Sequence, residues 1–248
     1  MAGLTLVGVG PGDPNLLTVA AVRAIEAATV VAYPVARQGA EGMAARIASP
    51  WLKNQQSHRP LLFPMVAAAE PRQMAWRYAA DQLSALVATG EQVVLLCEGD
   101  ASLFASCSYV LLDLAQRYPN CPTAVIPGIT AVAAAAAAAA TSLGMAWPLA
   151  LQQEGLLIKS TPNNVEEMEI LLDQAKASGT VLALLKLGQR WIWLQPLLEV
   201  RGLLNTSLFA QRVGWPDQLL ATADQVPAAE KPYFSLLLIR QSWPEVLP

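Results

Sequence analysis

The residues best suited to chemistry in this 248-residue chain begin in a glycine- and proline-rich segment near its start. Residues 7–18 read VGVGPGDPNLLT and overlap the end of an apolar run, Leu4–Val9, that predicts a strand. Glycines allow close backbone approaches that a Cβ would block, and prolines stiffen a turn. Because open α/β sheets bind ligands at the carboxyl ends of their strands, this segment is either a ligand-binding loop or a tight turn into the next helix.

A second segment repeats the arrangement. An apolar run ends at Glu98-Gly99-Asp100, and a helical stretch follows, so Asp100 and Asp13 occupy comparable places after two strands. We expect the two turns to face one cleft.

The dinucleotide fingerprint G-x-G-x-x-G fits this loop poorly. Gly8 and Gly10 supply its first two glycines, but the third position is Asp13, and Pro11 lacks the N–H that a pyrophosphate would accept. A nicotinamide or flavin site is therefore disfavoured. The chain has a single histidine, His58, which disfavours a His-based metal site and a Ser–His relay.

The composition bounds the class of protein. Hydrophobic residues make up 54% and charged residues 14%, which favours a large core over disorder, and the net charge of −3 argues against a nucleic-acid surface. Cys97, Cys107 and Cys121 are odd in number without C-x-x-C spacing, so we expect no disulfide, no structural zinc and a cytoplasmic location. No signal peptide is visible, and the alanine-rich segment 129–147 predicts a packed helix rather than a membrane span.

Strand-like and helix-like stretches alternate along the chain, which indicates an α/β protein with mostly parallel sheets. The expected strands are Leu4–Val9, Val30–Tyr33, Val93–Cys97, Thr123–Ile126, Val181–Lys186, Ser207–Gln211 and Phe234–Ile239. The expected helices are Thr18–Ala28, Gly42–Ala48, Arg72–Ala88, Ser106–Arg117, Thr130–Leu143, Val165–Ala177 and Gln189–Arg201. A proline-rich stretch near Asn120 divides the chain into expected domains at 1–120 and 121–248.

Five segments, in order, resemble the tetrapyrrole methylase family. They are GVGPGDP at 8–14, EGDASLF at 98–104, IPGITA at 126–131, LKLG at 185–188 and RVGWPD at 212–217. This resemblance implies two α/β domains with the cofactor, S-adenosylmethionine (SAM), in a cleft between them. The residues that it implies as lining the cofactor site are Pro11, Gly99, Asp100, Leu103, Thr130, Ala131, Leu187 and Val213. The alternative for Leu187 and Val213 is that they belong to the strand core.

A narrower likeness is to the members that methylate C20 of precorrin-2 or cobalt-precorrin-2 in cobalamin synthesis. It is carried by YP at 33–34, PLLFPM at 60–65, CEGD at 97–100, SY at 108–109, KLG at 186–188 and KPYFS at 231–235. Ala101 departs from the usual Gly-Asp-Pro, and residues 157–162 depart from the usual Val-Leu-Pro-Ala. The alternatives are another corrin or uroporphyrinogen III methylase, or a non-catalytic tetrapyrrole-binding module.

C20 methylation implies the loss of a proton, which a weak base could accept. The candidates by placement are Asp13, Glu98, Asp100 and Tyr109. Each has a structural alternative: the aspartates as turn or N-cap residues, Glu98 as a loop hydrogen-bonding residue and Tyr109 as helix core. The substrate carboxylates would suit arginines, and the candidates near loops are Arg37, Arg46, Arg59, Arg190 and Arg212. The apolar composition and the family also imply a homodimer.

Overall fold

The computed structural model describes residues 2–244 and divides the chain into two compact units, Met1–Thr130 and Ala131–Pro248. Each unit has one five-stranded sheet with helices packed on it, which confirms the predicted pair of α/β domains. The division falls at 130 rather than at 120, because β5 (Thr123–Ile126) pairs with β1 (Gly3–Gly8) in the first sheet. Residues 121–130 therefore belong to the first unit.

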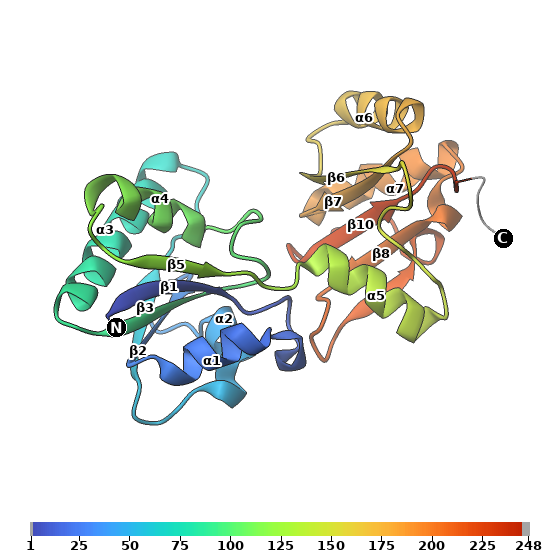
Figure 1. Cartoon of the computed structure of the whole chain (residues 1–248). Helices are drawn as coiled ribbons and strands as arrows, with labels where there is room; N and C mark the ends of the chain where they lie inside the picture. The colour runs from blue at the N-terminus through green and yellow to red at the C-terminus, as the bar shows by residue number, and fades with distance from the viewer. Residues whose placement is uncertain (1, 245–248) are drawn as a thin grey trace. The chain divides into compact units, whose positions relative to one another are not determined.

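The first sheet has the strand order β3-β2-β4-β1-β5, and all its pairings are parallel, as predicted. Its other strands are β2 (Val30–Val35), β3 (Ser57–Leu62) and β4 (Gln92–Cys97). Its helices are α1 (Val19–Ala27), α2 (Met43–Ala48), α3 (Ala69–Ala88) and α4 (Cys107–Arg117), with 3-10 turns at Pro14–Leu16 and Ser49–Trp51. Figure 1 shows α3 and α4 on one face of this sheet and α1 and α2 on the other.

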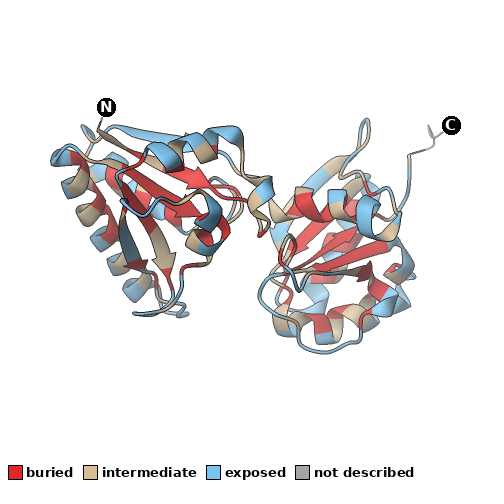
Figure 2. Cartoon of the chain, turned by 90° about the horizontal axis from the view of Figure 1, so that it is seen from below, coloured by how far each residue is buried: buried red, intermediate tan, exposed pale blue. Residues whose placement is uncertain are grey.

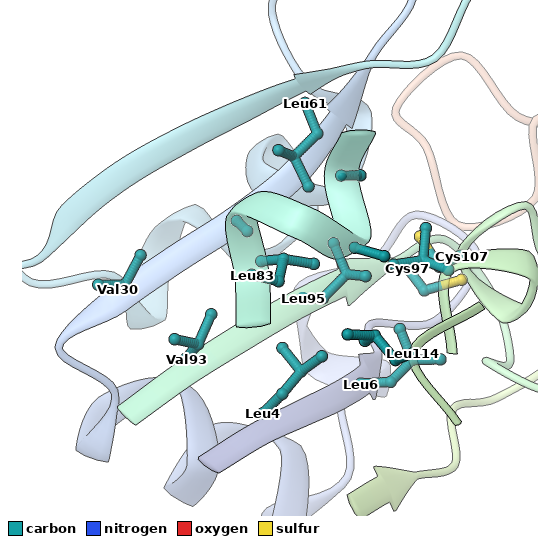
Figure 3. Close-up of a cluster of buried hydrophobic side chains, with 14 of the residues drawn as sticks. Leu4, Leu6, Val30, Leu61, Leu83, Val93, Leu95, Cys97, Cys107 and Leu114 are labelled. Carbon is teal, nitrogen blue, oxygen red and sulfur yellow. The ribbon is translucent and has the colours of Figure 1, made fainter. Parts of the chain in front are cut away.

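Burial on both faces explains why the central strands of the first sheet are apolar along most of their length. Leu4 and Leu6 of β1 and Val93 and Leu95 of β4 are almost fully buried, and they pack in one cluster with Leu83 of α3 (Figure 3). This core holds the carboxyl ends of β1 and β4 side by side, where the two predicted turns begin.

The second sheet has the order β6-β7-β10-β8-β9. In this sheet β6 and β7 pair in parallel, whereas β10 is antiparallel to β7 and β8, and β8 is antiparallel to β9. Over the two sheets most strand pairs are parallel, as predicted, and the antiparallel pairs belong to the second sheet. The strands are β6 (Gly155–Ser160), β7 (Thr180–Leu185), β8 (Ser207–Gln211), β9 (Leu219–Thr222) and β10 (Ser235–Ile239). The helices are α5 (Ala131–Leu143), α6 (Val165–Ala177) and α7 (Trp191–Val200), with 3-10 turns at Gly188–Arg190, Leu204–Thr206 and Ala223–Gln225.

The alanine-rich segment forms α5, which contacts β9, as expected for a helix packed closely on a sheet. Across residues 2–244, no helix is both long enough and apolar enough to span a membrane. Buried residues follow the strands of each unit and the helix faces turned toward them (Figure 2). Cys97, Cys107 and Cys121 are free thiols.

Candidate functional site

The loops after β1 and β4 are joined backbone to backbone. The N–H of Gly10 donates to the carbonyl of Gly99 at 3.1 Å, and the N–H of Gly99 donates to the carbonyl of Gly10 at 2.8 Å. Both glycines have left-handed φ angles, 79° and 66°, which residues with a side chain rarely adopt. The structure therefore brings the two predicted turns together, and Pro11 and Asp100 each follow one member of the pair.

A third loop, after β5, packs against this pair without room for a side chain. A Cβ built on Gly128 would lie 2.1 Å from the carbonyl oxygen of Gly99, and one built on Gly8 would lie 2.6 Å from the nitrogen of Gly128. A Cβ on Gly99 would meet nothing within 4 Å, so open space lies beside that residue. Gly8 and Gly128 were not among the predicted site residues, although both stand in the segments that carry the family resemblance, each at or just after the end of a strand.

Asp100 is buried, and its carboxylate is fully engaged by the protein. One oxygen accepts from the N–H of Ser102 at 2.8 Å and from the Ser102 hydroxyl, and the other accepts from the N–H of Gly128 at 2.8 Å. Burial alone would raise the pKa of Asp100, but the bonds from Ser102 and Gly128 outweigh it and lower the pKa below its usual value. The Asp100 side chain therefore holds two loops together as an ionised group, which makes it a poor proton acceptor.

Glu98 differs from Asp100 in the direction of its pKa shift and in the hydrogen bonds to its carboxylate. Burial raises the pKa of its carboxyl above the usual value. Among the described residues, no side chain or backbone N–H donates to its carboxylate, although the residue is half-buried. A carboxylate with a raised pKa and no fixed donors is suited to accept a proton, so Glu98 is better suited than Asp100 to act as a base.

The other two base candidates have structural contacts. Asp13 accepts from the N–H and the side-chain amide of Asn15 at 2.8 and 2.9 Å, as an N-cap of the turn Pro14–Leu16. Tyr109 is half exposed on the first turn of α4, and its ring stacks on Trp76 with centroids 4.1 Å apart. The structural alternative for Tyr109, a place in the helix core, does not hold, since the ring lies on the surface of the helix pair.

The remaining predicted cofactor residues lie at three places. Leu103 is half-buried in the loop after β4, and its N–H reaches the Asp100 carbonyl at 3.4 Å. Thr130 ends the first unit, and Ala131 begins α5 in the second.

Leu187 and Val213 follow β7 and β8 in the second unit, where both side chains are buried. Leu187 is fully enclosed in the core cluster, which agrees with the alternative interpretation of its side chain. The backbone of Leu187 is also engaged, since its N–H donates to the carbonyl of Ser235 at 3.4 Å and its carbonyl accepts from the N–H of Arg190 at 3.0 Å.

Strained backbone marks the loops that follow three strands. Lys186 and Arg212 have φ angles of 61° and 49°, and Phe104 has 54°, all in the left-handed region. Non-glycine residues are uncommon there and tend to cluster at ligand sites. Of the four non-glycine residues with left-handed φ angles in the described part of the chain, these three stand within segments that carry the family resemblance, and Gln152 does not.

Known proteins share the sequence pattern and the fold of this chain. The sequence pattern described as Tetrapyrrole (Corrin/Porphyrin) Methylases matches residues 3–226. The chain is 31% identical to the cobalt-precorrin-2 C(20)-methyltransferase of Salmonella typhimurium, with 97% of each chain covered. It is 32% identical to the cobalamin biosynthesis protein CobIJ of Mycobacterium tuberculosis, covering 94% of this chain but only 45% of that protein.

Two solved structures share the fold. The methyltransferase CobJ superposes with a TM-score of 0.67 at 21% identity, covering 97% of this chain and 94% of that one. The uroporphyrin-III C-methyl transferase of Thermus thermophilus, solved with S-adenyl homocysteine, has a TM-score of 0.60 at 21% identity and covers 96% of this chain and 97% of its own. With the family pattern extending over both units, the chain belongs to the tetrapyrrole (corrin/porphyrin) methylase family.

Proposed function

We propose that the chain is a SAM-dependent methyltransferase that methylates C20 of precorrin-2 or cobalt-precorrin-2. The observation that carries the proposal is the junction of Gly8, Gly99 and Gly128, where three loops meet with no side chain between them. The proposal is supported by likeness to a cobalt-precorrin-2 C(20)-methyltransferase along the whole chain. Since the chain spans less than half of CobIJ, an activity particular to that longer protein is a separate question.

The junction fits a cofactor such as SAM. Open space beside the left-handed Gly99 gives a ligand access to backbone, and the neighbouring glycines keep side chains out of its walls. The residues of the first unit that would hold SAM are Pro11, Gly99, Leu103 and Thr130, with Asp100 fixing the loops. Bound SAM would supply an electrophilic methyl group on a cationic sulfur.

The chain contributes position and proton transfer. Fixing two reactants in the correct geometry can lower a barrier by about 7–11 kcal/mol, and loops tied by paired backbone bonds are suited to that task. Glu98 would accept the proton that leaves C20, because burial raises the pKa of its carboxyl. Asp100 would stay ionised throughout.

The decisive experiment incubates the protein with SAM and precorrin-2, with and without cobalt, under anaerobic conditions. Mass spectrometry should show one added methyl group, and carbon NMR with labelled SAM should place it on C20. Methylation at another carbon, or of uroporphyrinogen III in preference, would identify a different methylase of the family. Binding of both ligands without turnover would replace the enzyme by a tetrapyrrole-binding module.

A further inference from the structure

The three central strands of the second sheet end or begin at one row of loops, which we call the loop edge of the sheet. This edge carries two cations on either side of an aromatic pair. Because β10 runs antiparallel to β7 and β8, its amino end lies beside their carboxyl ends (Figure 1). Lys186 directly follows β7, Arg212 directly follows β8, and Tyr233-Phe234 directly precede β10. Strands are about 4.8 Å apart, so the backbones of Lys186 and Arg212 stand about 10 Å apart across the aromatic pair.

Backbone hydrogen bonds fix this row. The N–H of Lys186 donates to the carbonyl of Ser235 at 3.0 Å, and the N–H of Arg212 donates to the carbonyl of Phe234 at 2.8 Å. Both cations are held in the left-handed region, where glycine would be the unstrained choice. Placing a long cationic side chain at each of these positions costs stability, which indicates a function for the side chains.

The guanidinium of Arg212 is oriented for a ligand. Its Nε donates to Asp217 at 2.7 Å, and the group lies 5.1 Å from the ring centroid of Trp215. Within residues 2–244, neither Nη nitrogen of Arg212 donates to a protein acceptor. The Nη pair of a guanidinium held in this way matches the two oxygens of a carboxylate.

The aromatic pair offers an apolar surface between the cations. Tyr233 and Phe234 are 48% and 39% exposed, and their rings are perpendicular with centroids 5.3 Å apart. The Lys186 Nζ lies 5.4 Å from the Tyr233 ring centroid. Across residues 159–163, 185–190, 211–218 and 229–234 there are five cations and two acids, although the whole chain carries −3.

We propose that this edge recognises the substrate: the macrocycle rests on Tyr233 and Phe234, and carboxylates on its rim bind Arg212 and Lys186. This inference rests on the proposed function, because a tetrapyrrole with acetate and propionate side chains combines an apolar ring with a charged rim. Arg212 gives the stronger contact, since its fork can bind both oxygens of one carboxylate, whereas Lys186 acts as a point charge.

The test measures the two ligands separately on the full chain. Tryptophan fluorescence follows binding of sirohydrochlorin, the oxidised form of precorrin-2, and calorimetry follows binding of S-adenosylhomocysteine. In Arg212→Gln we expect the Kd for sirohydrochlorin to rise about tenfold or more, with the Kd for S-adenosylhomocysteine changed less than about twofold. Lys186→Gln should have the same pattern with a smaller effect.

The matched control is Arg201→Gln. Arg201 lies in the same unit, is exposed to a similar degree (31% against 27% for Arg212) and also pairs with an aspartate, but it follows the carboxyl end of α7. It should alter neither Kd. Where Arg212→Gln folds poorly, Arg212→Gly removes the cation and relieves the left-handed strain, and it should weaken sirohydrochlorin binding equally.

The outcomes separate this inference from the proposed function. Unchanged sirohydrochlorin binding in Arg212→Gln and Arg212→Gly would overturn the assignment of the edge and leave the enzyme proposal standing. An equal loss of S-adenosylhomocysteine binding would also overturn it, because the edge would then serve the cofactor. Failure of the wild-type chain to bind either ligand would overturn the proposed function itself, and this inference with it.

Discussion

The carboxylate of Asp100 accepts a hydrogen bond of 2.8 Å from the N–H of Gly128, and this bond links the loop after β4 to the loop after β5. The two strands do not pair with each other, because β1 lies between them in the sheet. The Asp100 side chain therefore provides a connection that the strand ladder cannot, directly across the end of β1. Its cost, the burial of a charge, is offset by the three hydrogen bonds that it accepts.

The first prediction concerns pH. The folded pKa of Asp100 is lowered, so its ionised form stabilises the fold above the unfolded pKa of about 3.9, and this stabilisation disappears as pH falls through the folded value. Asp100→Asn should lower the free energy of unfolding by about 1–3 kcal/mol at pH 7. Urea titrations from pH 7 down to pH 3 should show that difference shrinking below about pH 4. A difference that stays constant with pH would contradict the assignment.

The second prediction tests the glycine junction by steric conflict. In Gly128→Ala the new Cβ would lie 2.1 Å from the Gly99 carbonyl oxygen, a backbone atom that cannot move away without breaking the bridge to Gly10. We expect a loss of about 3 kcal/mol or more in urea unfolding. Gly39→Ala is the control, because its Cβ has open space and its cost of about 1 kcal/mol comes from its left-handed φ alone. Equal losses in the two variants would show that the junction relaxes.

The third prediction separates strain from ligand contact. Gly99 and Gly39 both have left-handed φ angles, 66° and 74°, and both have open space at the Cβ position. Alanine at either position should therefore reduce stability by a similar amount, about 1 kcal/mol. Calorimetry with S-adenosylhomocysteine should show weaker binding for Gly99→Ala alone, because only there does the Cβ enter the proposed cofactor space. Equal affinities would place the cofactor elsewhere.

Sequence patterns predict the central strands of this fold well but miss three of its four edge strands, the exception being β5. The three strands that were not predicted are β3, β6 and β9, and each lies at the edge of its sheet. Edge strands are covered incompletely and need no continuous apolar run, and β3 even contains Pro60. By contrast, all seven helices occur where their periodicity and flanking residues predict them, within a few residues at their ends.

The candidate site was predictable as a set of loops and not as a set of contacts. The glycine motifs locate the turns after β1, β4 and β5, but nothing local reveals that Asp100 binds Gly128 or that Gly8 leaves no room for a Cβ. Those contacts depend on the strand order, which the sequence does not state. The left-handed backbone of Lys186 and Arg212 is likewise a result of the fold.

The fourth prediction is a homodimer. Large apolar side chains are exposed on α3 and α4, which pack against each other; they include Met74 at 65%, Tyr78 at 66% and Leu112 at 67%. Exposed apolar groups on neighbouring helices are typical of a protein interface. Light scattering should give about twice the chain mass of 26.4 kDa, and the double variant Met74→Glu/Leu112→Glu should give a monomer.

Val200→Glu serves as the control for the dimer. Val200 is 87% exposed at the end of α7, apart from the helix pair in the sequence and in a different unit. Its variant should remain dimeric. A monomeric wild-type chain at micromolar concentration would contradict the prediction outright.

The last prediction concerns Glu98, whose roles in stability and catalysis should oppose each other. Burial raises the folded pKa of Glu98, so protonation favours the folded state, and stability is lost as pH rises through that pKa. At pH 7 the ionised group therefore destabilises the fold, and Glu98→Gln should unfold at a higher urea concentration than the wild type. The same change removes the proposed base, so kcat should fall by about 10²- to 10⁴-fold with KM little changed. The acid limb of the wild-type kcat/KM profile should lie above the ordinary glutamate pKa of about 4.3.

Glu70→Gln, at an exposed position in the first turn of α3, should leave kcat and the profile unaltered. A Glu98→Gln enzyme with wild-type kcat would remove Glu98 from the catalytic scheme, because a neutral amide cannot accept the C20 proton.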